Sequence, residues 1–273
     1  MSYTFQPDQM YRMPTHFGPA TGPRRGPDGR KFLCEDNPKS TTIKVSFLSN
    51  AKQIEALLPP GFTLHGDPVV TVSATYMKEI EWLAGRGYNV LGVTIPARFS
   101  GQNDQAVGPF LTVLWENLAD PIITGREELG FSKIYCELPE IRISGNSASS
   151  SASWLGFNFL DINVDDLKPR REPAAGPKVD GQLHYKYIPR TGEWGTADVE
   201  YAVLTPAEGS NAKVHEDLAG EGSLNWNPAR WEDLPTFYQV VNALADLEVK
   251  EFIGGGLTRS IGAKDLSDQR ILS

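Results

Sequence analysis

Lys133 is the residue of this chain best suited to act as a nucleophile, because it lies in a segment that otherwise looks destined for the interior. Leu129, Phe131, Ile134 and Leu138 flank it. A lysine is rarely buried without a partner, and burial disfavours its charged form. The neutral amine that results can attack a carbonyl group and form a Schiff base. A second interpretation stays open, in which Lys133 lies at a strand edge with its ammonium group in water.

A Schiff base between a lysine and a ketone acts as an electron sink. It can take the electrons of a departing carboxylate, which is decarboxylation. It can also take those of a departing α-proton, which gives an enamine for aldol chemistry. The lysine must be neutral at working pH, so its pKa would have to fall by roughly 3 units from the usual value of about 10.4.

Other kinds of catalytic site have weaker support in the sequence. No metal site is expected, because none of the four histidines is followed by a second ligand at helical or hairpin spacing. These histidines are His16, His65, His184 and His215. The segment 145–149 lacks the second glycine of a serine-hydrolase elbow and is predicted to be a Ser-rich loop. Gly254–Gly256 is predicted to form a tight bend after a strand rather than a phosphate loop.

The run Gly125-Arg126-Glu127, followed by Lys133 in an apolar setting, resembles the active-site segment of the acetoacetate decarboxylase family. Four further stretches resemble other segments of that family and support the assignment. They are Gly26–Phe32, Leu57–Phe62, Asp67–Val70 and Leu247–Ile253. The resemblance extends over roughly residues 20–262, so it covers most of the chain.

The resemblance implies a lyase that forms a Schiff base with a small keto acid and needs no cofactor. Lys133 would be the nucleophile, and Arg30 would bind the substrate carboxylate, because a guanidinium group can hold a carboxylate through two hydrogen bonds. Arg126 is expected to orient the pocket rather than to react. Arg126 and Glu127 are adjacent, so in a strand their side chains would face opposite sides and could not pair.

The chain also departs from the family pattern. Ile134 stands where acetoacetate decarboxylases carry a second lysine, so desolvation would have to contribute more to activating Lys133. Ser73, and Asn89 or Val90, stand where the family has two pocket acids. The absence of the second acid favours aldol-dehydration, or a related reaction of a 2-oxo acid, over decarboxylation. Tyr88 is a candidate to replace a lost polar group, together with Glu79 and Glu81.

A non-catalytic function is the alternative. A barrel that binds a small apolar carbonyl compound, with Lys133 as a remnant, would show the same losses. The net charge of −8 argues against a nucleic-acid partner, and no apolar stretch approaches the roughly 18 residues of a membrane span. Two cysteines do not form a disulfide framework, so a cytoplasmic protein is expected. The resemblance adds the expectation of a homo-oligomer.

The elements that must position these residues are mainly strands. Alternating or β-rich runs predict them over 41–48, 69–76, 89–95, 111–116, 133–138, 153–160, 182–189, 197–205 and 247–253. Asn50, with Gln53 three residues later, predicts a short helix through Leu58. A second helix is predicted within 229–244, broken or kinked at Pro235. The segment 165–181 is predicted to be a loop.

Many strands, few helices and no alternation of strand and helix predict an α+β fold that is mainly antiparallel. An irregular N-terminal arm over 1–30 and a single domain over 31–273 are expected. The resemblance implies a closed, cone- or barrel-like sheet, and such a sheet encloses a pocket.

Overall fold

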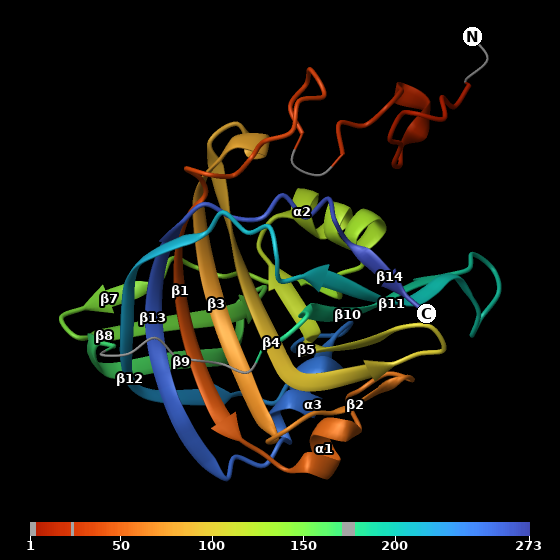
Figure 1. Ribbon diagram of the computed structural model, residues 1–273. Helices are drawn as coiled ribbons and strands as arrows, with labels where there is room; N and C mark the ends of the chain where they lie inside the picture. Colours follow the sequence, from red (N-terminus) through yellow and green to blue (C-terminus); the bar gives the residue numbers. More distant parts are fainter. Residues whose placement is uncertain (1–3, 23–24, 171–177) are drawn as a thin grey trace.

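A 14-stranded sheet dominates the computed structural model, which describes residues 4–22, 25–170 and 178–273 (Figure 1). In chain order its strands are β1 (Lys39–Leu48), β2 (Phe62–Leu64), β3 (Val69–Ile80), β4 (Arg86–Ser100), β5 (Gln105–Glu116), β6 (Lys133–Tyr135), β7 (Arg142–Ser144), β8 (Ser147–Trp154), β9 (Phe157–Pro169), β10 (Gly181–Pro189), β11 (Ala197–Pro206), β12 (Lys213–Trp226), β13 (Glu251–Ile261) and β14 (Arg270–Leu272).

The sheet follows the order β14-β11-β10-β5-β4-β3-β1-β13-β12-β9-β8-β7, with β2 paired to β4 and β6 paired to β5. Most of these pairs are antiparallel, whereas β5 pairs with β6 and β10 in parallel. This confirms the mainly antiparallel α+β fold. Figure 1 shows the long strands curving together into a barrel-like shape. Within the described residues no pairing joins β14 to β7, so hydrogen bonds do not close the sheet.

The alternating strands bury one face in a continuous core. Along β1, Ile43, Val45 and Phe47 are buried, whereas their neighbours are partly exposed. The pattern continues along β3, where Val70, Val72, Ala74 and Tyr76 are buried. Successive side chains of a strand point to opposite faces, so this alternation of apolar and polar residues holds each strand in register with one face inward.

The helices are short, and apart from η1, which lies in the N-terminal segment, they lie toward the ends of the curved sheet. They are η1 (Thr15–Phe17), α1 (Ala51–Glu55), η2 (Glu81–Leu83), α2 (Ala119–Thr124), η3 (Gly125–Leu129), which is a π-helix, and α3 (Tyr238–Ala245). Figure 1 shows α2 at the end of the sheet where the N-terminal segment passes, and α1 and α3 at the opposite end.

Two predicted helices are confirmed with changed bounds. Asn50 caps α1 by accepting a hydrogen bond from the Lys52 backbone, at 3.0 Å. The Gln53 side chain does not complete a capping box, because it instead bonds the backbone of Asp246 and Glu248. The second helix, α3, begins only after Pro235, because a proline ring disfavours a helical residue before it.

The predictions for three segments, 145–149, 153–160 and 165–181, are wrong. The segment 153–160 is a hairpin rather than one strand, because Leu155 and Gly156 both adopt positive φ between β8 and β9. The Ser-rich segment is a turn followed by strand β8, since small serine side chains fit a partly buried strand. The predicted loop 165–181 begins as strand, because β9 continues through Pro169. Its residues 171–177 lie outside the described part of the chain.

Gly254–Gly256 lies inside β13 and forms no tight bend. The strand predicted over 247–253 therefore begins later, at Glu251, and continues through the glycines to Ile261. A Cβ atom on Gly255 would lie 2.8 Å from Val164 Cγ2 and 2.9 Å from Gly222 Cα. The glycines therefore permit close contact between β13 and the neighbouring strands, which a side chain would prevent.

Residues 4–22 and 25–38 contain no helix or strand other than η1 in the structure. The division into an arm over 1–30 and one domain over 31–273 stays a prediction. In the described part of the chain, no helix is long and apolar enough to span a membrane.

Candidate active site

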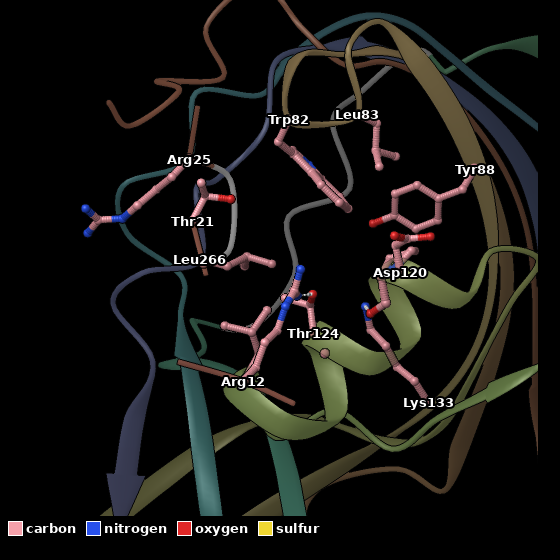
Figure 2. A pocket seen from close by; sticks show the side chains of 14 residues that line it. Arg12, Thr21, Arg25, Trp82, Leu83, Tyr88, Asp120, Thr124, Lys133 and Leu266 are labelled. Carbon is pink, nitrogen blue, oxygen red and sulfur yellow. Dashed lines mark hydrogen bonds between the residues drawn. The ribbon is translucent and has the colours of Figure 1, made fainter. Parts of the chain in front are cut away.

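A cavity with an empty volume of about 640 Å³ lies beside α2 and opens the interior toward the N-terminal segment (Figure 2). The arm, η2, β4, α2, η3 and β6 all contribute to its wall. The lining residues are Arg12, Thr21, Gly22, Arg25, Trp82, Leu83, Tyr88, Asp120, Pro121, Thr124, Gly125, Leu129, Lys133 and Leu266. The cavity thus combines one lysine, two arginines and one carboxylate with apolar side chains such as Trp82 and Leu83.

Lys133 begins β6, and the pairing of this strand with β5 determines the position of its amine. β6 runs parallel to β5, with Lys133 opposite Leu114. The lysine is only 6% exposed. Its Nζ atom lies 2.8 Å from Glu116 Oε1 and donates a hydrogen bond of 3.0 Å to the Pro121 carbonyl oxygen. The structure therefore contradicts the interpretation that places this amine in bulk water at a strand edge.

Burial and pairing act in opposite directions on the charge of this amine. Removal from water disfavours the ammonium form, whereas a carboxylate at ion-pair distance favours it. Glu116 is 1% exposed, so the ion pair is shielded from solvent on both sides. In such a pair, the proton can reside either on the Lys133 amine or on the Glu116 carboxylate.

Gly125 explains the first residue of the Gly-Arg-Glu motif. A Cβ atom at this position would lie 2.3 Å from Lys133 Cδ and 2.7 Å from Lys133 Nζ. Both distances are below contact distance, and the obstacle would touch the reactive atom itself. The glycine is required here because the helix backbone and the lysine side chain pass against each other.

The rest of the motif ties η3 to Lys133 and to Lys186. Arg126 Nη1 donates a hydrogen bond of 2.9 Å to the Lys133 carbonyl oxygen. The Glu127 carbonyl oxygen accepts a bond of 2.6 Å from the buried Lys186. Gly130 ends η3 with a φ of 84°, the left-handed conformation that favours glycine. Arg126 and Glu127 belong to the π-helix η3, so the condition of a strand, under which their side chains would face opposite sides, does not apply.

β6 separates the site from a second cavity on its other side. Ser132 and Ile134 line this second cavity, together with Arg126 and Lys186. Successive residues of a strand point to opposite faces, so Lys133 faces the first cavity alone. Arg126 therefore reaches the site through the Lys133 backbone and does not line the cavity that holds the amine.

Arg12 connects the N-terminal segment to the helices beside Lys133. Its Nη1 atom donates a hydrogen bond to Thr124 Oγ1 and lies 3.7 Å from Glu128 Oε1. Burial raises the pKa of Glu128, and the nearby Arg12 guanidinium opposes this shift. Figure 2 shows the Arg12 guanidinium pointing into the same space as the Lys133 side chain and the Trp82 ring.

A neutral histidine lies behind the lysine. Burial lowers the pKa of His184 to about 3, and the charge of Lys133 adds to this shift. Its ring packs on Phe131 at 4.2 Å, and the Lys133 amine lies 5.2 Å from the centre of the same Phe131 ring. His184 Nε2 lies 2.8 Å from Thr205 Oγ1, which in turn donates to Gln269 at 2.7 Å. The wall behind Lys133 therefore carries no second positive charge from this histidine near neutrality.

The structure brings two of the predicted site residues to the cavity and leaves four away from it. Lys133 and Tyr88 line the cavity. Arg30 is exposed and faces Asp28 at 4.0 Å, away from the lining. Ser73 lies on the partly exposed face of β3, whose buried face carries Val72 and Ala74. The Arg126 side chain bonds the Lys133 carbonyl oxygen, and the Glu127 carbonyl oxygen bonds Lys186, so neither residue lines the cavity.

Several residues of the site were not predicted from the sequence. Glu116 had a signal, because it is a single acid ending the apolar run Phe110–Trp115. Arg12 and Asp120 had none, since their place at the cavity depends on how distant segments pack. The aromatic residues Tyr76 and Trp115 belong to the core, and Tyr135 is exposed. Asn89, aligned with a family acid, is buried and donates to the Leu138 carbonyl oxygen.

The described residues contain no group of three or more His, Cys, Asp or Glu side chains that could hold a metal ion. Both cysteines, Cys34 and Cys136, are buried free thiols. Burial raises the pKa of the Cys136 thiol, with Glu137 and Glu116 adding to the effect. A raised pKa leaves the thiol protonated, which makes it a poor nucleophile.

Comparison with known proteins identifies the family of this site. The model of the acetoacetate decarboxylase (ADC) family matches residues 12–261. The chain belongs to the acetoacetate decarboxylase family. It is an acetoacetate decarboxylase-like lyase, and the match confirms the resemblance seen in the sequence. No curated protein matches the chain in sequence.

Solved structures share the fold of this acetoacetate decarboxylase-like lyase at low sequence identity. An acetoacetate decarboxylase is 15% identical, with a TM-score of 0.65, and the match covers 91% of this chain and 94% of the other. A second, from Legionella pneumophila, is 17% identical, with a TM-score of 0.62 and coverages of 87% and 86%. The enduracididine biosynthesis enzyme MppR, complexed with the condensation product of pyruvate and imidazole 4-carboxaldehyde, is 17% identical. Its TM-score is 0.64 and the coverages are 92% and 97%.

Proposed function

We propose that this protein is a Schiff-base-forming lyase that acts on a small keto acid through Lys133. The observation that carries the proposal is a lysine only 6% exposed whose amine faces a cavity beside a buried carboxylate. Family membership supports the same chemistry.

Glu116 supplies the proton transfers that imine formation requires. Its carboxylate takes a proton from the Lys133 ammonium group at 2.8 Å, and the free amine adds to the ketone carbon. The carbinolamine then loses its hydroxyl group as water when that oxygen is protonated, leaving a protonated imine. One water is released for each imine formed, and hydrolysis of the product imine consumes one water and restores the lysine.

Arg12 is the carboxylate anchor in this proposal. The resemblance assigns that role to Arg30, but the exposed Arg30 side chain lies outside the cavity wall. Arg12 lines the wall and points into the space beside the amine (Figure 2). A guanidinium group at this place can hold a carboxylate through charge-assisted hydrogen bonds.

A carboxylate held by Arg12 favours reactions in which that carboxylate is kept. A cation stabilises the ionised group in the ground state, which opposes its departure as carbon dioxide. The protonated imine then loses an α-proton, and the resulting enamine attacks an aldehyde. The product loses water in an aldol-dehydration. The pyruvate condensation product in the MppR structure supports this choice over decarboxylation.

Reduction with borohydride tests the proposal directly. In the presence of pyruvate or acetoacetate, the protein is expected to gain the mass of one reduced adduct on Lys133. Lys133→Ala should gain none, whereas Lys186→Ala, which removes the other buried lysine beside β6, should still be labelled. Glu116→Gln keeps the shape of the acid and should slow labelling by roughly 10²-fold or more. The measurement is peptide mass spectrometry after timed reduction.

The absence of an adduct across a panel of keto acids would overturn the proposal and favour a non-catalytic binding protein. Release of carbon dioxide from acetoacetate at a rate above that of Lys133→Ala would favour decarboxylation.

The homo-oligomer and the cytoplasmic location implied by the sequence stay predictions. Light scattering of the purified chain measures the first.

A further inference from the structure

One wall of the cavity is built from large apolar side chains rather than from groups that touch a small keto acid. Trp82 and Leu83 come from η2, and Tyr88 comes from the neighbouring strand β4. The Trp82 and Tyr88 rings meet edge to face, with centroids 6.0 Å apart. Figure 2 shows Trp82, Leu83 and Tyr88 on the side of the cavity that faces Arg12 and Lys133.

A single methyl group, such as that of pyruvate, cannot contact Trp82, Leu83 and Tyr88 at the same time. Leu129 and Leu266 add further apolar lining. Apolar surface left in contact with water contributes no binding energy, so a ligand gains most here by placing a ring or a branched chain against it.

We propose that the keto acid used by this enzyme carries an aromatic or other bulky apolar group. This inference rests on the proposed function and adds the substrate class to it. The carboxylate would lie at Arg12 and the carbonyl carbon at Lys133 Nζ. The apolar group would then pack on Trp82 and Leu83, with Tyr88 at its edge. Trp82 becomes the residue that determines specificity.

Trp82 also has a structural contact, which the test must separate from ligand binding. It lines a smaller neighbouring cavity with Phe32 and Met77, so its loss could loosen the β3–β4 connection. A structural effect alone would weaken the binding of all ligands alike. A role in specificity would instead remove the preference between a large and a small ligand.

Acids without a carbonyl group test the wall independently of imine formation. Calorimetry should show that the wild-type chain binds 3-phenylpropanoate on the order of tenfold or more tightly than propanoate. Trp82→Ala should reduce this preference to less than threefold, and Trp82→Phe should restore it. Trp194→Ala is the matched control, because Trp194 is 97% exposed, and it should keep the full preference. If Trp82→Ala loses its native circular dichroism, Leu83→Ala takes its place.

Equal binding of the two acids by the wild-type chain would overturn the inference, and so would an unchanged preference in Trp82→Ala. Borohydride labelling with pyruvate and phenylpyruvate separates this failure from failure of the proposed function. Equal labelling by both keto acids would overturn the substrate class and leave Lys133 as the nucleophile. No labelling by either, with the preference among acids intact, would overturn the Schiff-base reaction and retain the ligand class.

Discussion

The immediate surroundings of Lys133 Nζ come from three separate parts of the chain. Glu116 ends β5, Pro121 lies in α2, and Gly125 begins η3. Glu116 contacts the amine through a carboxylate oxygen and Pro121 through a carbonyl oxygen, whereas Gly125 leaves room for the amine because it has no side chain. A single added methyl group at Gly125 would therefore change the position of the Lys133 amine.

Gly125→Ala is expected to remove most of the reactivity while the fold persists. The new methyl group would lie 2.7 Å from Nζ and push the amine from its place. A displacement of about 1 Å in a reacting group can cost on the order of 10²-fold in rate. Timed borohydride labelling, with circular dichroism as a check of folding, measures the effect.

Gly156→Ala is the control for that substitution. Gly156 has a positive φ, of 88°, in the β8–β9 turn, and a methyl group added there would meet no atom within 4 Å. The substitution should cost about 1–2 kcal/mol of stability and leave labelling unchanged. Full reactivity of Gly125→Ala would show that the amine can relocate freely.

At the scale of elements, the site joins a short strand, a helix pair and a segment without regular structure. β6 has only three residues, yet its parallel pairing with β5 aims Lys133 and Ile134 at different cavities. The π-helix η3 holds the strand through the hydrogen bond from Arg126. The N-terminal segment adds Arg12, whose contacts with Thr124 and Glu128 fasten it to the helices.

Arg12 and Arg30 are a matched pair for testing which arginine anchors the substrate. Arg12→Ala is expected to weaken labelling by 2-oxobutanoate roughly 10- to 100-fold, because a charge-assisted hydrogen bond is lost. Labelling by butanone, which has a methyl group in place of the carboxylate, should change little. Arg30→Ala should affect neither ligand, since Arg30 lies outside the cavity wall. The concentration of each ligand that gives half-maximal labelling is the quantity to compare.

A stronger effect of Arg30→Ala than of Arg12→Ala on 2-oxobutanoate would contradict this assignment. It would restore the role that the family resemblance implies for Arg30.

At the scale of the whole molecule, the site lies where distant strands of one large sheet meet. The main core runs from β1 through β5 and on to β8, β9 and β10, whereas Leu129 and Leu266 of the cavity wall pack in a smaller, separate cluster with Leu111 and Phe131. Two buried features let that sheet curve and pack: the glycines within β13, and polar groups such as His184 that are bonded within the interior. Substitutions at either feature are expected to change the free energy of unfolding rather than the rate of Schiff-base formation.

His184 should make the fold less stable in acid. Its pKa is about 3 in the folded chain, against 6.5 for an ordinary histidine, so the unfolded chain binds a proton first as the pH falls. Stability is therefore lost below about pH 6.5, by about 1.4 kcal/mol for each pH unit, until the folded form also protonates near pH 3.

Urea denaturation at several pH values between about 7.5 and 5 measures this effect. His184→Gln should lose less stability over that range than the wild-type chain, whatever its stability at the upper end. His215→Gln, at an exposed position, should follow the wild-type curve. Parallel curves for wild type and His184→Gln would show that His184 does not contribute to the acid sensitivity.

Gly255→Ala should destabilise the whole sheet by about 1–3 kcal/mol, because the added methyl group would overpack Val164 and the Gly222 backbone. Thr258→Ala, at a partly exposed position of the same strand, should change stability by less than about 1 kcal/mol. The free energy of unfolding from urea denaturation measures both. Equal effects of the two substitutions would contradict the close packing proposed for Gly255.

The sequence by itself determined the strand-rich fold class and the family, and it predicted Lys133 as the nucleophile. Alternating residues such as those of β1 are a local signal, and the segment from Gly125 to Lys133 contains the motif and the reactive residue together. Local sequence patterns do not predict the structure of a residue whose surroundings come from other strands. The glycines of β13 looked like a bend, because only the neighbouring strands show why side chains are excluded there.

The tertiary structure alone decided which groups surround the amine. Glu116 reaches it from β5, Asp120 and Arg12 reach the cavity from α2 and the N-terminal segment, and Arg30 lies away from it. The physical reason is that side-chain contacts across a sheet depend on register, curvature and the path of an irregular segment. None of these is encoded in the spacing of a few residues along the chain.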